Sequence, residues 1–149
     1  MTGPTHCFTP DLLQGKRALV TGGGTGIGRA IAFALAQAGA DLILAARQLP
    51  ALQATAKEIE TETGRNVLVT QVDIRSLESV QTLAEFVTEN GAQVDILVNN
   101  AGGQFPQAAE NYSANGWRSI IDLNLNGTWN VTQALGQQML EGHGGVICN

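Results

Sequence analysis

Five glycines lie close together in the segment VTGGGTGIGRA, residues 20–30. Glycine allows the backbone to turn sharply, and it lets a phosphate approach main-chain N–H groups without a Cβ in the way. A helix that begins near Ile27 would direct its positive end at that anion. The spacing Gly22-x-x-x-Gly26-x-Gly28 differs from the common G-x-G-x-x-G fingerprint, so a tight structural turn is the alternative. Because an apolar run precedes the glycines and an amphipathic stretch follows them, the segment predicts a phosphate or dinucleotide site.

A second chemical signal stands at the end of the next apolar run, where the sequence reads LAAR. Sites for NAD(H) usually carry a carboxylate here, which binds the ribose 2′-hydroxyl. Ala45 and Ala46 offer no carboxylate, and Asp41 stands at the wrong end of the run. The guanidinium of Arg47 can instead bind a 2′-phosphate. The sequence therefore favours NADP(H) over NAD(H), with a solvated charge at a strand end as the alternative for Arg47.

The elements that must position these residues alternate between short β-rich runs and longer amphipathic stretches. This alternation is typical of βαβ units that build a parallel sheet with helices on both faces. We expect strands at residues 17–21, 41–46, 66–73, within 94–103, and at 145–149. We expect helices at residues 27–38, 50–63, from a cap at Ser76 to 90, and from a cap at Ser113 to 140, the last as one long or two consecutive helices.

The composition limits the class of protein. The chain has 149 residues, 44% of them hydrophobic, which predicts one α/β domain over residues 1–149, with residues 1–12 as a loose N-terminal arm. A net charge of -5 without a basic stripe argues against nucleic acid as a partner. The absence of a long apolar run or a secretory signal argues against a membrane and predicts a cytoplasmic protein. Cys7 and Cys148 indicate reduced thiols, and no metal site is expected.

Three motifs, TGGGTGIG, NNAGG and LNLNGT, occur in this order and at suitable separation. Together they resemble the short-chain dehydrogenase/reductase family, from about Leu13 to Asn149. The resemblance implies a doubly wound, Rossmann-type parallel sheet, of which this chain holds the N-terminal part. It also implies a nicotinamide cofactor lying across the carboxyl ends of the strands, with Arg47 as the 2′-phosphate ligand of NADP. The region of residues 113–140 resembles the subunit interface of the family, so we expect a homotetramer.

The resemblance assigns roles to individual residues. Asp73 would meet the adenine amino group, although a loop aspartate that turns into a helix cap is the alternative. The NNAG motif of the family is matched by Asn99, Asn100, Ala101 and Gly102. In that motif the Asn braces the sheet, while the Ala and Gly let the cofactor ribose lie close. The catalytic assignment is Asn124, the helix-kinking residue that holds a water in the proton relay; otherwise it is a mild helix destabiliser. The implied cofactor-binding residues are Gly22, Gly24, Thr25, Gly26, Ile27, Gly28, Arg47, Asp73, Ile74, Asn99, Ala101 and Gly102.

A finer resemblance is to the 2,4-dienoyl-CoA and trans-2-enoyl-CoA reductases. It is carried by LLQGKRALVTGGGTGIG, LAAR, DIR and NNAGGQFPQAAENYSANGW. In that branch the residues that match Phe105 and Ser113 border the acyl thioester, and those that match Arg47 and Arg75 help to seat the CoA phosphates. A loop aromatic that packs on the sheet edge is the alternative for Phe105, and a solvated charge is the alternative for Arg75.

The sequence departs from the family in one respect. The catalytic Ser and Tyr-x-x-x-Lys, or the altered Tyr/Lys arrangement of the acyl-CoA branch, would follow Asn149. Tyr112, the single tyrosine, has Gly116 four positions on and cannot take that role. Because hydride transfer needs a proton donor and a lysine beside it, we expect the 149 residues to be an inactive piece of a longer enzyme.

The activity that we expect of the longer enzyme is NADPH-dependent reduction of unsaturated fatty acyl-CoA thioesters. Two alternatives stay open. One is a ketone or alcohol oxidoreductase of the same family. The other is a non-catalytic NADP-binding or assembly module, if 149 residues is the natural length.

Overall fold

The computed structural model describes residue 9 and residues 11–149. The expected arm over residues 1–12 falls mostly outside these described residues, and Cys7 falls wholly outside them. The strands are β1 (Arg17–Thr21), β2 (Asp41–Ala46), β3 (Val67–Gln71), β4 (Ile96–Val98) and β5 (Val146–Cys148). The helices are α1 (Gly26–Gln37), α2 (Leu49–Thr63), α3 (Leu77–Glu89), α4 (Ala114–Ile121) and α5 (Gly127–Glu141), with a 3-10 turn η1 (Ala109–Asn111) and a π-helical turn η2 (Asp122–Asn126).

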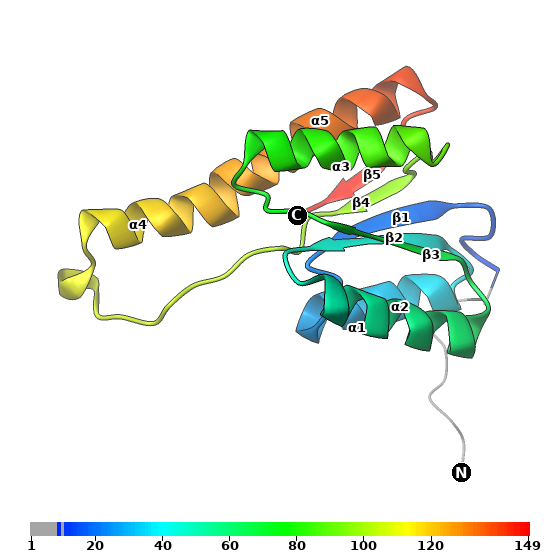
Figure 1. Cartoon of the computed structure of the whole chain (residues 1–149), viewed down its shortest axis with the longest axis horizontal. Coiled ribbons are helices and arrows are strands. Elements are labelled where there is room, and N and C mark those ends of the chain that lie inside the picture. The colour runs from blue at the N-terminus through cyan, green and yellow to red at the C-terminus, as the bar shows by residue number, and fades with distance from the viewer. Residues whose placement is uncertain (1–8, 10) are drawn as a thin grey trace, which may run out of the picture.

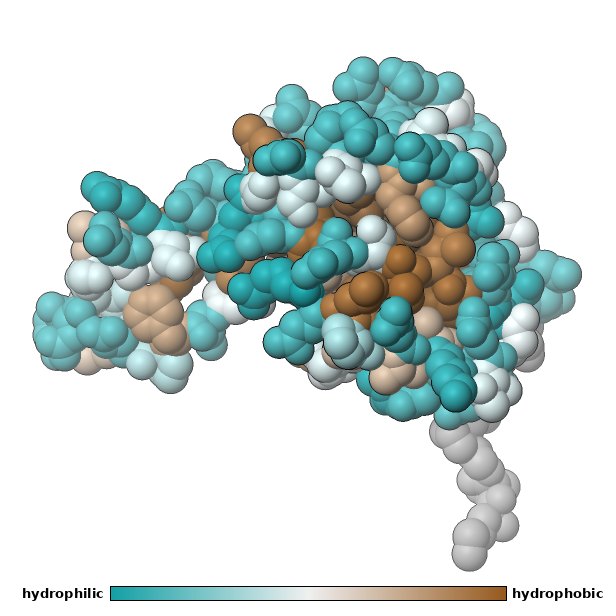
Figure 2. Space-filling model, in the orientation of Figure 1, coloured by the Kyte–Doolittle hydropathy of each residue, from teal (hydrophilic) through white to brown (hydrophobic). Residues whose placement is uncertain are grey.

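The five strands form one parallel sheet in the order β3-β2-β1-β4-β5. Helices α1 and α2 cover one face of this sheet, and α3 and α5 cover the other (Figure 1). Alternate residues of a strand point to opposite faces of the sheet. Leu19 packs in the core under α3 and α5, while Ala18 and Val20 pack in the core under α1 and α2. Hydrophobic side chains gather between the two helix layers, where the sheet lies (Figure 2). The predicted doubly wound α/β fold is confirmed.

Helix ends follow the predicted signals. The Ser76 hydroxyl accepts a hydrogen bond from the Ser79 N–H at 3.2 Å, and the Ser113 hydroxyl accepts one from the Gly116 N–H at 3.0 Å. Gly64 ends α2 in the left-handed region, with a φ of 68°. Such a conformation is cheap for glycine and strained for other residues.

Two boundaries differ from expectation. Strand β3 ends at Gln71 rather than residue 73, because the Asp73 N–H leaves the sheet ladder and donates to the Ser79 hydroxyl at 3.0 Å. The last helical region is one continuous path through α4, η2 and α5, interrupted by the π-helical turn.

The carboxyl-terminal part of the described chain leaves much apolar surface open. Helix α4 contributes no buried residue, and the three residues of β5 are all exposed. Figure 1 shows α4 and the segment before it extending beyond the sheet. Within residues 9 and 11–149, no helix has both the length and the apolar character that a membrane crossing requires.

Candidate cofactor-binding site

A cavity of about 420 Å³ opens at the carboxyl ends of the strands, at the position where the strand order reverses between β1 and β4. Ligands of open parallel sheets bind at such switch points, and a small-molecule site typically has about 300–1,000 Å³. All of the predicted cofactor-binding residues except Asn99 line this cavity. The fold therefore brings the glycine loop, the end of β2, the segment after β3 and the loop after β4 to one place.

The glycine loop needs glycine at particular positions, for reasons of backbone conformation or of space. Gly22 and Gly26 have φ values of 70° and 54°, a region that favours glycine. A Cβ on Gly28 would lie 2.3 Å from the Gly22 carbonyl oxygen and 2.4 Å from Asn100 Nδ2. Because α1 begins at Gly26, the free N–H groups of its first turn lie beside the cavity. This donor set fits the pyrophosphate of a dinucleotide.

The floor of the cavity is held by hydrogen bonds between β1 and the loop after β4. The Thr21 hydroxyl donates to the Val98 carbonyl at 3.3 Å and accepts from the Ala101 N–H at 3.0 Å. Asn100 Nδ2 donates to the Thr21 carbonyl at 2.9 Å. The side chain of Asn100 thus lines the cavity and holds the end of β1, although the predicted cofactor-binding set contained its neighbour Asn99 instead.

Asn99 is the one predicted cofactor-binding residue that does not line the cavity, so its contact with the cofactor stays a prediction. Its Nδ2 donates to the Thr132 hydroxyl on α5 at 2.8 Å and to Asn149 Oδ1 at 2.8 Å. Successive side chains of an extended segment point to opposite sides, and here Asn99 contacts α5 while Asn100 contacts the end of β1. This alternation along residues 96–100 is the signal that could have identified Asn100.

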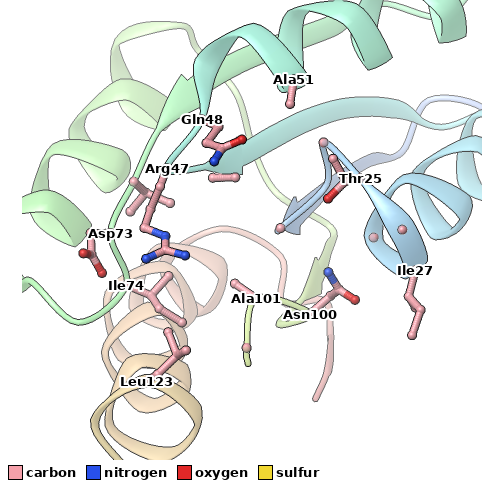
Figure 3. Close-up of a pocket in the computed structure, with 17 residues that line it drawn as sticks. Thr25, Ile27, Arg47, Gln48, Ala51, Asp73, Ile74, Asn100, Ala101 and Leu123 are labelled. Carbon is pink, nitrogen blue, oxygen red and sulfur yellow. The ribbon is translucent and has the colours of Figure 1, made fainter. Parts of the chain in front are cut away.

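Arg47 extends its guanidinium into the cavity from the end of β2 (Figure 3). The described residues form no ion pair with it. Gln48 and Ala51, from the beginning of α2, line the same wall. This wall therefore presents a cation that is free to bind a ligand anion.

Asp73 is held by Arg75. Arg75 Nε lies 3.0 Å from Asp73 Oδ1, and an Arg75 terminal nitrogen lies 2.6 Å from Asp73 Oδ2. This hydrogen bond lowers the pKa of Asp73 to about 2, against the opposing effect of its partial burial. Asp73 lines the cavity, whereas Arg75 lies outside it in a neighbouring polar groove that also involves Asn115 and Arg118.

The predicted catalytic and substrate residues lie around and beyond the rim. Asn124 lies in the π-helical turn, next to the cavity residue Leu123. Phe105 stacks on Tyr112 with ring centroids 5.4 Å apart, and Ser113 caps α4. Neither Phe105 nor Ser113 lines the cavity, so their contact with an acyl group stays a prediction. Across the described part of the chain, no three His, Cys, Asp or Glu side chains gather as metal ligands would.

A parallel sheet that reverses its order at β1, with a glycine loop at the carboxyl edge, defines a dinucleotide-binding α/β protein. A sequence model described as short chain dehydrogenase matches residues 16–149, and the chain belongs to this family. The predicted family is thereby confirmed.

The chain is similar to several known proteins. It is 35% identical to a peroxisomal 2,4-dienoyl-CoA reductase of Danio rerio, over 97% of this chain and 48% of that protein. It is 44% identical to a probable 2,4-dienoyl-CoA reductase of Caenorhabditis elegans, over 94% of this chain and 47% of that protein. The structure of L-sorbose reductase from Gluconobacter frateurii, complexed with NADPH and L-sorbose, is 32% identical, with a TM-score of 0.86 over 93% of this chain and 53% of that chain. The chain thus spans about half the length of the relatives that it matches.

Proposed function

We propose that this chain forms the NADP(H)-binding part of a reductase. The observation that carries the proposal is the guanidinium of Arg47, which no described residue pairs with, in the same cavity as the glycine loop. It stands at the carboxyl end of β2, where the sequence offers no carboxylate. The complex of L-sorbose reductase with NADPH supports the same cofactor. A guanidinium binds a 2′-phosphate through paired, charge-assisted hydrogen bonds that a 2′-hydroxyl cannot match.

The roles of the cavity residues follow from their positions. The first-turn N–H groups after Gly26 bind the pyrophosphate, and Arg47 holds the 2′-phosphate. Asp73 meets the adenine amino group, while Ala101 and Gly102 let the ribose lie close. When bound, the nicotinamide supplies a hydride, and the chain positions it. Asn124, at the rim, holds the loop after β4 in place and is the proposed site of the relay water.

For the substrate, we propose an unsaturated fatty acyl-CoA thioester. The support is the similarity to 2,4-dienoyl-CoA reductases over most of this chain. Phe105 and Ser113 would border the thioester, and Arg75 would contact CoA phosphates after exchanging its ion pair with Asp73 for a phosphate. A ketone or sugar substrate is the second candidate, because L-sorbose reductase is similar over 93% of the chain.

The longer protein would act as a homotetramer, assembled through the region of residues 113–140. Support comes from exposed apolar side chains on α4, η2 and α5, namely Trp117, Leu125 and Trp129. A cytoplasmic location stays a prediction, since the relative from Danio rerio is described as peroxisomal.

The cofactor proposal is tested by binding of NADPH and NADH to the chain with Arg47→Glu. We expect NADPH affinity to fall about 10- to 100-fold and NADH affinity to change little, because only NADPH carries the 2′-phosphate. Lys57→Glu, an equal change in charge at an exposed site on α2, is the control. Equal losses for the two cofactors in Arg47→Glu would contradict the assignment.

The substrate proposal is tested in the longer protein by NADPH oxidation with dienoyl-CoA, crotonyl-CoA and simple ketones. Faster oxidation with the thioesters supports the acyl-CoA assignment. Faster oxidation with ketones or sugars supports the second candidate, and binding of NADPH without any turnover supports a non-catalytic module.

A further inference from the structure

Thr55 is a buried polar residue outside the cavity lining. Within the described residues, the buried polar or charged side chains are Thr21 and Thr55, with exposed fractions of 1% and 2%. Thr21 holds the floor of the cavity through its hydrogen bonds to Val98 and Ala101. Thr55 lies on α2, and its hydroxyl donates to the Gly24 carbonyl in the glycine loop at 2.9 Å. A buried hydroxyl aimed at a loop carbonyl fixes the direction of that peptide group.

Gly24 lies directly against the first turns of α2. A Cβ at this position would lie 3.1 Å from the Leu52 nitrogen and 3.2 Å from the Ala51 carbonyl carbon. This is where the glycine loop meets the helix that follows Arg47. In Figure 3 the loop at Thr25 and the side chain of Arg47 stand on either side of the pocket. The peptide between Gly24 and Thr25 is therefore part of the wall that a 2′-phosphate on Arg47 would face.

We propose that Thr55 is a positioning residue for the 2′-phosphate side of the cofactor site, because its hydroxyl holds the Gly24 carbonyl out of the cavity. In a trans peptide the C=O and N–H groups point in opposite directions, so a carbonyl turned toward α2 keeps its negative end away from a bound anion. The inference rests on the proposed NADP(H) function and deepens it. It makes cofactor selectivity depend on a residue that touches no cofactor.

The expected consequence of removing the hydroxyl is rotation of this peptide. Without Thr55, the Gly24 carbonyl is left buried and unpaired, which is unfavourable. A partial rotation changes ψ of Gly24, where glycine is permissive, and φ of Thr25, which at -152° can shift within the extended region. This rotation turns the carbonyl toward water in the cavity. Its oxygen then lies near the phosphate and repels it. NAD⁺ lacks the 2′-phosphate, and the first-turn N–H groups that bind the pyrophosphate of both cofactors begin at Gly26, beyond the rotated peptide.

The test compares Thr55→Val with the wild-type chain in titrations with NADP⁺ and NAD⁺. We expect the Kd for NADP⁺ to rise about three- to tenfold and the Kd for NAD⁺ to stay within about twofold. A purely structural role would weaken both ligands together. Thr55→Ser, which keeps the hydroxyl, is expected to retain the wild-type ratio of the two Kd values.

The matched control is Thr61→Val, the same change on the same helix. The Thr61 hydroxyl is exposed and donates to the Lys57 carbonyl within α2. If Thr55→Val does not fold, Thr55→Ala replaces it, with the same expected change in ratio. An unchanged ratio in a folded variant without the hydroxyl overturns the inference alone. A wild-type chain that does not prefer NADP⁺ to NAD⁺ overturns the proposed function and the inference with it.

Discussion

The side-chain amide of Asn124 holds the backbone of Gly103 at both its polar groups. Asn124 Nδ2 donates to the Gly103 carbonyl at 2.8 Å, and its Oδ1 accepts from the Gly103 N–H at 3.0 Å. The same Nδ2 donates to the Ile120 carbonyl at 2.9 Å. Asn124 lies in the π-helical turn η2, and π-turns of this kind occur often at functional sites. One side chain thus connects the interrupted helix to the loop that leaves the cavity.

This connection predicts the effect of Asn124→Leu, which keeps the size of the side chain and removes its hydrogen bonds. We expect the Gly103 amide to exchange its hydrogen at least about threefold faster, with a loss of about 1 kcal/mol in unfolding free energy. Hydrogen exchange and urea unfolding measure the two effects. Asn126→Leu is the control in the same turn, because Asn126 Nδ2 donates only to Asp122 Oδ1 among the described residues. Equal exchange rates in both variants would contradict the connection.

The ion pair between Asp73 and Arg75 predicts a pH dependence of stability. The pKa of Asp73 falls from 3.8 to about 2 on folding, so its contribution is complete above about pH 4 and is lost as the pH falls through about 2. The difference in unfolding free energy between wild type and Asp73→Asn should therefore be constant from about pH 7 to 5 and shrink below about pH 4. Urea unfolding across this range measures it. Because the pair is partly exposed, salt should reduce the difference, and a difference that grows toward acid pH would contradict the prediction.

The crowding around Gly28 predicts a strong effect of a single methyl group. In Gly28→Ala the new Cβ would overlap the Gly22 carbonyl, so the loop must open. We expect a loss of about 2–4 kcal/mol in unfolding free energy and loss of NADP⁺ binding. Gly136→Ala on α5 is the control, because its Cβ would meet Ile147 at 3.7 Å, an ordinary contact. That variant should be more stable by about 0.5–1 kcal/mol, as alanine favours a helix. Normal NADP⁺ binding by Gly28→Ala would show that the loop tolerates side chains.

Much of the fold could be predicted from local patterns, since Ser76, Gly64 and the apolar runs each determine nearby structure. The position of Arg47 at the cavity followed from the rule that parallel strands end at one edge. Local patterns could not predict which of Asn99 and Asn100 lines the cavity, because this depends on which side chain meets β1 and which meets α5. The role of Thr55 could not be predicted either. Residues 24 and 55 are far apart in the sequence, and only the packing of α2 on the loop brings them together.

The exposed apolar residues of α4, η2 and α5 predict self-association of the chain. Trp117, Leu125 and Trp129 are each about 60% exposed and follow one another along this helical path. Single exposed apolar residues are common on protein surfaces, whereas a group of them marks an interaction site. We expect sedimentation equilibrium to show concentration-dependent association, weakened at least about tenfold by Trp117→Lys with Trp129→Lys, since each change removes a large apolar contact and adds a charge. Leu12→Lys, at an exposed leucine before β1, is the control and should leave association unchanged. Association that persists in the double variant would assign the contact to the exposed strand β5, whose unpaired edge can accept another strand.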